Sequence, residues 1–328
     1  MPIISVRDLV KEFRTPKRAP GLVGAIRTLF TTEQRVTRAV DGVSLDIEEG
    51  ELVGYLGRNG AGKSTTIKCL TGILVPTSGQ VVVDGVIPWR DRQRNALNIG
   101  VVFGQRSQLW WDIPLADSLE LIGRMYRLDQ PTYRRNLATL SALLGLEPFL
   151  DKSVRQLSLG QKMRGDLAAA MLYEPRVLYL DEPTVGLDVL AKERIRSFIV
   201  EMNRTRGTTV LLTTHDLKDV ELLCRRIVLI ELGRVLYDGT VADLKRRYAP
   251  FRELVITLAV EADVDLPGAE RVRQEGPQSW LRFDPERVPV ADLIVAATTR
   301  YPVRDIAIEE PELETVVRQI FAEREEPR

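Results

Sequence analysis

Cysteine and histidine are scarce in this chain, and their scarcity excludes several kinds of site. The only cysteines among the 328 residues are Cys69 and Cys224, and the only histidine is His215. Because the cysteines stand far apart, without a CxxC pattern or a Cys/His cluster, neither a disulfide framework nor a zinc site is indicated. We expect both to be buried, inert thiols. The single histidine excludes multi-histidine metal sites and concentrates any imidazole chemistry at one position.

Long apolar runs and an excess of one charge are also missing. The chain has no run of about 18 apolar residues, the length that a membrane-spanning helix needs. Its N-terminus, MPIISVRDLV, lacks the basic segment and sustained apolar stretch of a secretory signal. The 46 basic residues are matched by 46 acidic ones, whereas proteins that track nucleic-acid phosphates usually carry a basic excess. The sequence therefore predicts a protein that stays in the cytosol, and no nucleic-acid partner is expected.

Two changes of pattern along the chain predict one large domain and one small one. Strand-like and helix-like segments alternate through roughly the first 240 residues, which favours an α/β domain with a largely parallel sheet. Within it, leucines and isoleucines recur at helical intervals over residues 106–157, which predicts a helical subdomain. Later strand-like segments (FRELVITLAV, SWLRFD) and helix-like ones (DLIVAATTRY, PELETVVRQIFAE) predict a small α+β domain. We therefore expect a domain of residues 1–243 and an accessory domain of residues 244–328.

The most basic stretch of the chain is residues 14–38, where six basic residues are set against one acid. The basic residues are Arg14, Lys17, Arg18, Arg27, Arg35 and Arg38, and the acid is Glu33. Within this stretch, GLVGAIRTLF places its apolar side chains on one face of a short helix. Such a face suits a membrane surface or a partner protein, and it equally suits packing on its own domain.

A phosphate-binding loop is the firmest motif in the sequence. GRNGAGKS (residues 57–64) matches the Walker A, or P-loop, pattern G-x-x-x-x-G-K-[ST], with a strand (ELVGYLG) before it and a helix (KSTTIKCLTGI) after it. Its glycines let backbone N–H groups converge on phosphates, Lys63 reaches the β and γ phosphates, and Ser64 offers a hydroxyl to Mg²⁺. A glycine-rich turn with a coincidental lysine is the alternative. The expected nucleotide-binding residues are Gly57, Arg58, Asn59, Gly60, Ala61, Gly62, Lys63, Ser64 and Thr65.

A pair of acids at the end of a second strand narrows the kind of NTP site. RVLYLDE (residues 176–182) reads as a buried strand that delivers Asp181 and Glu182 to its tip. There Asp181 can hold Mg²⁺ and Glu182 can polarise an attacking water as a general base. The alternative is an N-cap and a first-turn acid of the next helix. The two acids and the loop together predict NTP hydrolysis.

The segment LSLGQ (residues 157–161), between the loop and the acid pair, carries a family resemblance. It resembles the LSGGQ signature of ABC-type ATPases, so the chain is similar to that family over residues 3–240. In the family this segment reaches the γ-phosphate of ATP that the opposite subunit holds. The expected residues here are Ser158, Leu159, Gly160 and Gln161, with Ser158 placed to cap the following helix. Leu159 departs from the family pattern because it replaces the first glycine.

Other family positions follow in order along the chain. Gln105, after an extra-looking Gly104, resembles the glutamine that touches Mg²⁺ and the attacking water. Asp188, in GLD, resembles the acid of the loop that crosses the dimer, and His215 resembles the switch histidine that reads the γ-phosphate. Phe13 stands where the family has an aromatic that stacks on adenine, and a core phenylalanine is the alternative.

The resemblance implies the architecture and the partners. It implies a P-loop ABC ATPase domain with a mainly parallel sheet, an antiparallel β subdomain and a helical subdomain, and with ATP and Mg²⁺ as cofactors. The chain would pair with itself or a close relative and drive ABC-2 type membrane permease subunits, most similar to exporters, at the cytoplasmic face of the cell membrane. Trp110 and Trp111 are candidate permease contacts, with a core role as the alternative. A soluble ABC ATPase acting on nucleic acid or ribosomes, a non-hydrolysing regulator and an unrelated P-loop kinase are the competing functions.

Overall fold

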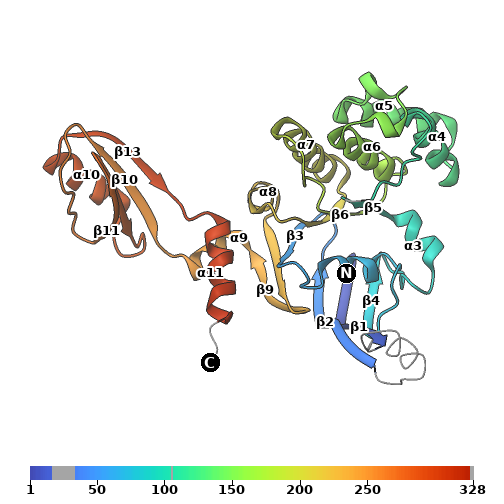
Figure 1. The fold of residues 1–328 in the computed structure, drawn as a ribbon, viewed down its shortest axis with the longest axis horizontal. Coiled ribbons are helices and arrows are strands. Elements are labelled where there is room, and N and C mark those ends of the chain that lie inside the picture. The colour runs from blue at the N-terminus through green and yellow to red at the C-terminus, as the bar shows by residue number, and fades with distance from the viewer. Residues whose placement is uncertain (17–33, 105, 326–328) are drawn as a thin grey trace, which may run out of the picture. The chain divides into compact units, whose positions relative to one another are not determined.

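The computed structural model describes residues 1–16, 34–104 and 106–325, and the chain divides into two compact units. These are Met1–Asp238, the N-terminal unit, and Gly239–Arg328, the C-terminal unit (Figure 1). The boundary predicted at residues 243/244 lies within helix α9 (Val241–Tyr248). Each unit has its own hydrophobic core, and each is described by itself below.

A six-stranded sheet forms the centre of the N-terminal unit. In spatial order its strands are β5 (Ile99–Phe103), β6 (Val177–Asp181), β7 (Thr209–Thr213), β3 (Leu52–Gly57), β8 (Arg226–Glu231) and β9 (Arg234–Thr240). The first five run parallel to one another. Their sequences are near-continuous apolar runs because both faces of a parallel sheet are covered. The parallel arrangement brings the carboxyl ends of β3, β6 and β7 to one edge, where the nucleotide motifs begin.

A second sheet shares a hydrophobic core with the large sheet and with the helix that follows β3. Its antiparallel strands are, in order, β2 (Gln34–Ile47), β1 (Ile4–Pro16) and β4 (Ser78–Val83). Ile4 and Ile47 of this sheet, Ile67 of helix α2 (Lys63–Leu70) and Val228 of the large sheet belong to one buried cluster. The helix that starts at the phosphate-binding loop is therefore fixed between two sheets.

Helices flank the two ends of the large sheet and form a separate cluster. The helices of this unit after α2 are α3 (Arg92–Asn98), α4 (Leu115–Met125), α5 (Gln130–Leu144), α6 (Leu159–Met171), α7 (Val189–Arg206) and α8 (Leu217–Leu223), with 3₁₀ turns at Glu147–Phe149 and Val154–Gln156. In Figure 1, α4, α5 and α6 gather on the opposite side of the large sheet from β1, β2 and β4. Leu119, Leu140 and Leu167, one from each helix, are fully buried. This cluster carries the signature segment at the start of α6.

The C-terminal unit is a four-stranded antiparallel sheet with helices. Its strands, in order, are β11 (Ala269–Glu275), β12 (Gln278–Phe283), β10 (Arg252–Leu258) and β13 (Val303–Glu309). Its helices are α9, α10 (Val290–Arg300) and α11 (Leu313–Glu325). The structure confirms the predicted strands β10 and β12 and the predicted helices α10 and α11. The sequence missed β11 and β13 because both are edge strands whose residues are mostly exposed, so they lack the burial pattern of a half-buried strand.

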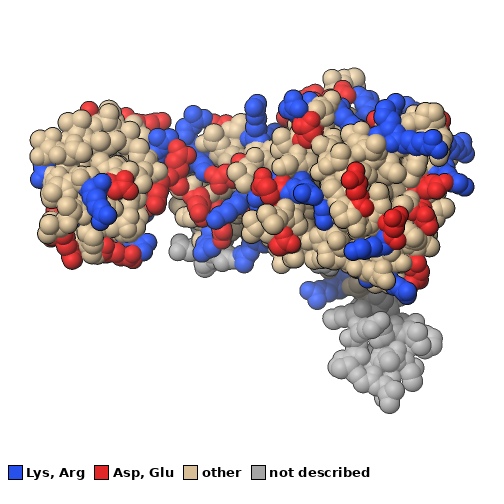
Figure 2. Space-filling model, turned by 90° about the horizontal axis from the view of Figure 1, so that it is seen from above, with Lys and Arg blue, Asp and Glu red and all other residues tan. Residues whose placement is uncertain are grey.

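The described residues allow some of the expectations about charge and apolar stretches to be compared with the structure. No helix among them is both long enough and apolar enough to span a membrane. Lys and Arg are interspersed with Asp and Glu over the face shown in Figure 2, in keeping with their equal numbers. Of the basic stretch, residues 17–33 and the short apolar-faced helix predicted there lie outside the described residues. Arg38, at its end, pairs with Glu12 and with Asp41, both at 2.9 Å.

Candidate nucleotide site

The phosphate-binding loop is shaped by glycines that touch other backbone atoms. A Cβ at Gly57 would lie 2.3 Å from the carbonyl oxygen of Ile230, and one at Gly62 would lie 2.3 Å from that of Ala39. Gly62 also has φ +105°, a conformation that side chains disfavour. The loop between β3 and α2 therefore takes a path that only glycine permits, and it leaves backbone N–H groups at the N-terminus of α2 free of side chains.

Lys63 is held inside this loop. It is only 6% exposed, and its ammonium donates hydrogen bonds to the carbonyl oxygens of Gly57 (2.6 Å) and Arg58 (3.2 Å). Burial lowers the pKa of Lys63, and the nearby charges of Glu182 and Asp181 oppose that shift. The ammonium of Lys63 thus donates to two neutral carbonyl oxygens. A phosphate would offer it charged oxygens, which are stronger acceptors.

Three of the predicted site residues line one cavity of about 370 Å³. They are Ser64 at the start of α2 and Asp181 and Glu182 at the end of β6. Lys68, Ile73, Phe103 and Arg106 complete its wall. The Ser64 hydroxyl stands at least 117 positions from the two carboxylates in the chain. They meet because β3 and β6 end at the same sheet edge.

The acid pair and the histidine form a connected polar group. Asp181 accepts a hydrogen bond from the hydroxyl of Thr213 at 2.5 Å, and Glu182 Oε1 lies 2.5 Å from His215 Nε2. The backbone N–H of Glu182 donates to the carbonyl oxygen of Thr213 (2.9 Å), and Glu182 adopts φ +59°. The N-cap alternative for these acids is wrong, because the next helix, α7, begins at Val189 and is capped by Asp188.

Gly104 is a site residue whose role sequence reasoning missed. A Cβ on it would lie 2.4 Å from the carbonyl oxygen of Glu182, and its N–H donates to the carbonyl oxygen of Asp181 at 2.8 Å. Its φ is outside the left-handed region, so close approach rather than backbone strain requires glycine. What looked like an extra residue is the point where the chain crosses the backbone of Asp181 and Glu182. Gln105, next to it, lies outside the described residues.

The signature segment starts helix α6 and caps it with its own polar groups. Ser158 is the N-cap: its hydroxyl accepts from the N–H of Gln161 (3.3 Å), and Gln161 Oε1 accepts from the N–H of Ser158 (2.9 Å). The predicted cap is confirmed. Leu159 is 49% exposed and lies over Gly186, where an added Cβ would be 3.1 Å from its Cδ2. None of the residues from Ser158 to Gln161 lines the cavity, so a single chain does not bring the two halves together.

The remaining predicted residues lie at the surface of the N-terminal unit. Asp188 caps α7 by accepting from the N–H of Ala191 at 2.8 Å. Phe13, on β1, is 38% exposed, so its core alternative is wrong. Trp110 and Trp111 are 40% and 55% exposed, which also contradicts a core role, and the ammonium of Lys162 lies 4.2 Å from a Trp111 ring centre.

Both cysteines are buried, as expected, and neither is a reactive thiol. Burial raises the pKa of Cys69 to about 11 and also raises the pKa of Cys224. A thiol that stays protonated at neutral pH is a poor nucleophile and a poor metal ligand.

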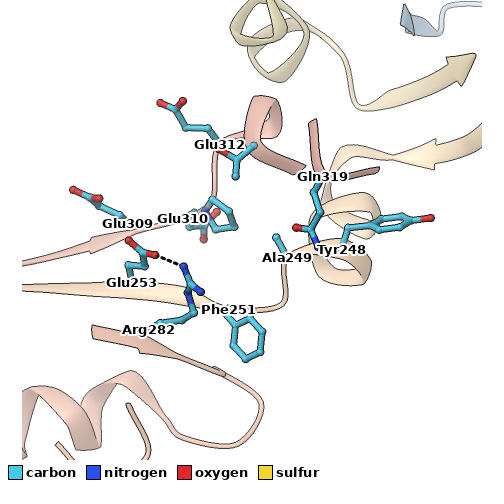
Figure 3. Close-up of a pocket in the computed structure, with 11 residues that line it drawn as sticks. Tyr248, Ala249, Phe251, Glu253, Arg282, Glu309, Glu310, Glu312 and Gln319 are labelled. Carbon is cyan, nitrogen blue, oxygen red and sulfur yellow. Dashed lines mark hydrogen bonds and ion pairs between the residues drawn. The ribbon is translucent and has the colours of Figure 1, made fainter. Parts of the chain in front are cut away.

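A larger cavity lies within the C-terminal unit, but its chemistry differs (Figure 3). It has a volume of about 490 Å³ and is lined by residues of α9, β10, β12, β13 and α11. Glu253 pairs at 3.1 Å with Arg282, which lies opposite it on the neighbouring strand, and Glu310 pairs with Arg252 at 2.7 Å. No residue predicted for the nucleotide site lines it. Size alone therefore does not identify the functional site of this chain.

Known proteins similar to this chain share its N-terminal unit. The family model for the ABC transporter matches residues 40–185. The ABC transporter ATP-binding protein NatA of Bacillus subtilis is 33% identical over 215 residues, which is 66% of this chain and 87% of that protein. The daunorubicin resistance ATP-binding protein DrrA3 of Streptomyces coeruleorubidus is 38% identical over 212 residues, 63% and 65% of the two chains. The methionine import ATP-binding protein MetN of Haemophilus influenzae is 34% identical over 223 residues, 67% and 64%.

A solved structure shares the fold. It is the dimeric, post-hydrolysis state of the ATP-binding cassette MJ0796 bound to ADP and Pi, with a TM-score of 0.60 and 25% sequence identity. The similarity covers 72% of this chain and 98% of that one. The fold is therefore that of a nucleotide-binding cassette. The phosphate-binding loop, the acid pair and the histidine lie at one edge of its sheet.

Proposed function

Because the chain belongs to the ABC transporter family as an ATP-binding, ATP-hydrolysing subunit, we propose that two copies of it, or it and a close relative, close around two ATP molecules and drive an ABC-2 type export permease. The observation that carries the proposed site is the Glu182–His215 contact of 2.5 Å beside the cavity that Ser64 and Asp181 line. This contact supports our proposal that Glu182 is the general base, that His215 holds it and that Ser64 and Asp181 are oxygen ligands for a metal.

One chain supplies the binding half of each site. The backbone N–H groups of residues 57–65 and the ammonium of Lys63 hold the phosphates, while Phe13, exposed on β1, stacks on adenine. On ATP binding, Lys63 exchanges its two carbonyl acceptors for phosphate oxygens. Charge-assisted hydrogen bonds of this kind are stronger than those to neutral carbonyls, so the exchange favours binding.

The residues at the cavity fit a hard divalent cation. Ser64 contributes a hydroxyl and Asp181 a carboxylate, and Mg²⁺ in phosphate sites takes one or two such oxygens together with substrate phosphates. Gln105 is the third proposed ligand. The described residues contain no cluster of three His, Cys, Asp or Glu side chains, in keeping with a cation held largely by ATP itself. When bound, Mg²⁺ would offset the charge of the phosphates.

Hydrolysis needs a base and a means of holding it. We assign the base to Glu182, whose carboxylate faces the cavity, and we assign His215 to the γ-phosphate. In this arrangement His215 holds Glu182 Oε1 until the γ-phosphate offers the imidazole another partner. Gln105 would orient the water between them.

The second half of each site comes from the partner. Ser158, Leu159, Gly160 and Gln161 begin an exposed helix N-terminus, and the positive end of a helix favours an anion such as the γ-phosphate. Asp188, in the loop beside it, would cross to the opposite subunit. Because the segment lies outside the cavity of its own chain, ATP between two chains is the arrangement that completes the site.

The permease assignment is supported by the relatives and by exposed aromatics. DrrA3 is named for drug resistance, which favours export, whereas MetN is named for import. Trp110 and Trp111 follow the proposed glutamine and are exposed, as contacts to a membrane subunit need to be. Such a contact would hold the chain at the cytoplasmic face of the membrane. The soluble alternative, acting on nucleic acid or ribosomes, is not favoured because the relatives are named for transport.

The variant Glu182→Gln tests this function. It should bind ATP and pair, because the amide keeps the size of the carboxylate, while hydrolysis falls about 10²- to 10⁴-fold through loss of the base. ATPase rate and light scattering with ATP measure the two effects, and Glu147→Gln, an exposed glutamate in a 3₁₀ turn, is the control. Wild-type turnover in Glu182→Gln would reject Glu182 as the base. Absence of pairing would reject the two-chain site. The direction of transport is measured separately, in vesicles that contain the chain together with the membrane protein that purifies with it.

A further inference from the structure

A buried carboxylate lies outside the nucleotide cavity, in the middle of helix α6. Asp166 is 5% exposed, and burial raises the pKa of its carboxyl to about 6. Aspartate is almost never fully buried unless it is paired or hydrogen-bonded, so its partners indicate what it holds in place.

The partners of Asp166 come from the segment that follows Gln105. Asp166 Oδ1 accepts from the hydroxyl of Ser107 at 3.0 Å and from the backbone N–H of Gln108 at 2.9 Å. The Gln108 side-chain amide donates back to the carbonyl oxygen of Asp166 at 3.0 Å, and the N–H of Leu109 donates to the Ser107 hydroxyl at 3.1 Å. One helix position thus holds two consecutive residues from another part of the chain, and Ser107 in turn holds Leu109.

Close packing surrounds the contact between Asp166 and residues 107–108, which we call the joint. A Cβ at Gly165, next to Asp166, would lie 2.9 Å from Leu109 Cδ1 and 2.9 Å from Leu115 Cδ1. The segment after β5 therefore lies directly on the backbone of α6. A hydrogen-bonded group in such a dry contact is costly to break, because its donors would be left without partners.

The two ends of the joint belong to different halves of the proposed ATP sites. Phe103 and Arg106, just before Ser107, line the chain's own cavity. Helix α6 begins with the signature segment, which the proposed function presents to ATP on the partner. Asp166 lies two helical turns into α6 and does not line the nucleotide cavity.

We infer that Asp166 is a positioning residue that couples the wall of the chain's own ATP cavity to the signature segment offered to the partner. ATP that shifts Phe103 and Arg106 moves Ser107 and Gln108, and the hydrogen bonds to Asp166 carry that movement to α6 as a unit. The inference rests on the proposed two-chain site, because without pairing the signature segment has nothing to meet.

The test uses the full-length chain with Glu182→Gln as the parent, so that hydrolysis does not disperse the pair. Asp166→Ala should raise the ATP concentration for half-maximal pairing about tenfold, the middle of the range for coupling residues. ATP affinity of the unpaired chain should stay within about twofold of the parent, because Asp166 contacts no residue of the phosphate-binding loop. Asp166→Asn offers an amide oxygen in place of Oδ1 and should pair like the parent. Ser107→Ala removes one hydrogen bond with little loss of packing and should give an intermediate shift.

Light scattering at graded ATP, with ATP titrated into dilute unpaired chain, separates the outcomes. Pairing of Asp166→Ala and Ser107→Ala at the parental ATP concentration would overturn the inference. Equal losses of pairing and of ATP affinity would also overturn it, because they would show a general structural role. A defect in Asp166→Asn as large as in Asp166→Ala would assign the effect to charge instead of to the hydrogen bonds. Failure of the parent to pair would reject the proposed function itself, which is a different result.

Discussion

The phosphate-binding loop and the signature segment place their polar groups in opposite surroundings. Lys63 is 6% exposed and held by two carbonyl oxygens, and Gly62 is locked against the backbone of Ala39. Ser158 is exposed, and only its own helix satisfies its hydroxyl. The loop is thus shaped by contacts with other parts of the chain, whereas the signature segment is exposed and its cap is formed within its own helix. Substitutions in the loop should affect ATP binding by a single chain, and those in the signature segment should affect pairing.

The largest expected effect is on the loop side. Lys63→Ala removes a charged donor from the phosphates, so the Kd for ATP should rise about 10- to 100-fold and pairing should fail as a consequence. Isothermal titration of the unpaired chain measures the affinity directly. Lys152→Ala, at an exposed lysine, is the matched control. An unchanged Kd would break the comparison, because ATP would then be held elsewhere.

A smaller effect, confined to hydrolysis, is expected at the crossing point of the two acids. Gly104→Ala forces a Cβ against the carbonyl oxygen of Glu182, and a displacement of a catalytic group by about 1 Å can cost 10²-fold in rate. We therefore expect kcat to fall about 10²-fold while the affinity for ATP is retained.

The control for this change is Gly100, on β5, the strand that Gly104 follows. Gly100→Ala places its Cβ 2.5 Å from the carbonyl oxygen of Ala170, a similar clash that does not touch Glu182. Both variants should lose thermal stability, and only Gly104→Ala should lose turnover in excess of that loss. Equal turnover in the two would show that the crossing matters for folding alone.

The smallest expected effect is on the signature side. Leu159→Ala removes the side chain that covers Gly186, while the N-terminus of α6 and its cap remain. ATP affinity of the unpaired chain should not change, and the ATP concentration needed for pairing should rise about threefold, close to the loss of one buried methylene. Leu97→Ala is the control, because Leu97 is also 49% exposed and lies on α3. Tighter pairing by Leu159→Ala would mean that the leucine obstructs the partner.

The sequence allowed the site to be predicted where chemistry lies in short, contiguous motifs. Ser64, Asp181 and Glu182 line one cavity and His215 contacts Glu182, and these four residues come from three separate segments of the chain. These residues can be found because each follows an apolar strand, and parallel strands deliver their ends to one edge. The roles of the site residues in ATP hydrolysis stay predictions.

What the sequence did not reveal depends on contacts between distant segments. Asp166 lies 59 positions from Ser107 and 58 from Gln108, and nothing in a helical pattern distinguishes a buried aspartate from an exposed one. Gly104 gave a visible signal, a glycine at a strand end, but its reason is a carbonyl oxygen 78 positions away. Close approach of this kind follows from tertiary packing, which local propensity does not encode.

The charged edge strands of the C-terminal unit have a consequence for how the subunit survives on its own. β11 carries Glu270, Arg271 and Arg273, and β13 carries Arg304 and Asp305, so each outer row of unpaired N–H and C=O groups is bordered by solvated charge. A flat apolar edge would invite another chain to extend the sheet without limit. These charged edges therefore discourage fibril-like growth of the sheet from one chain to the next.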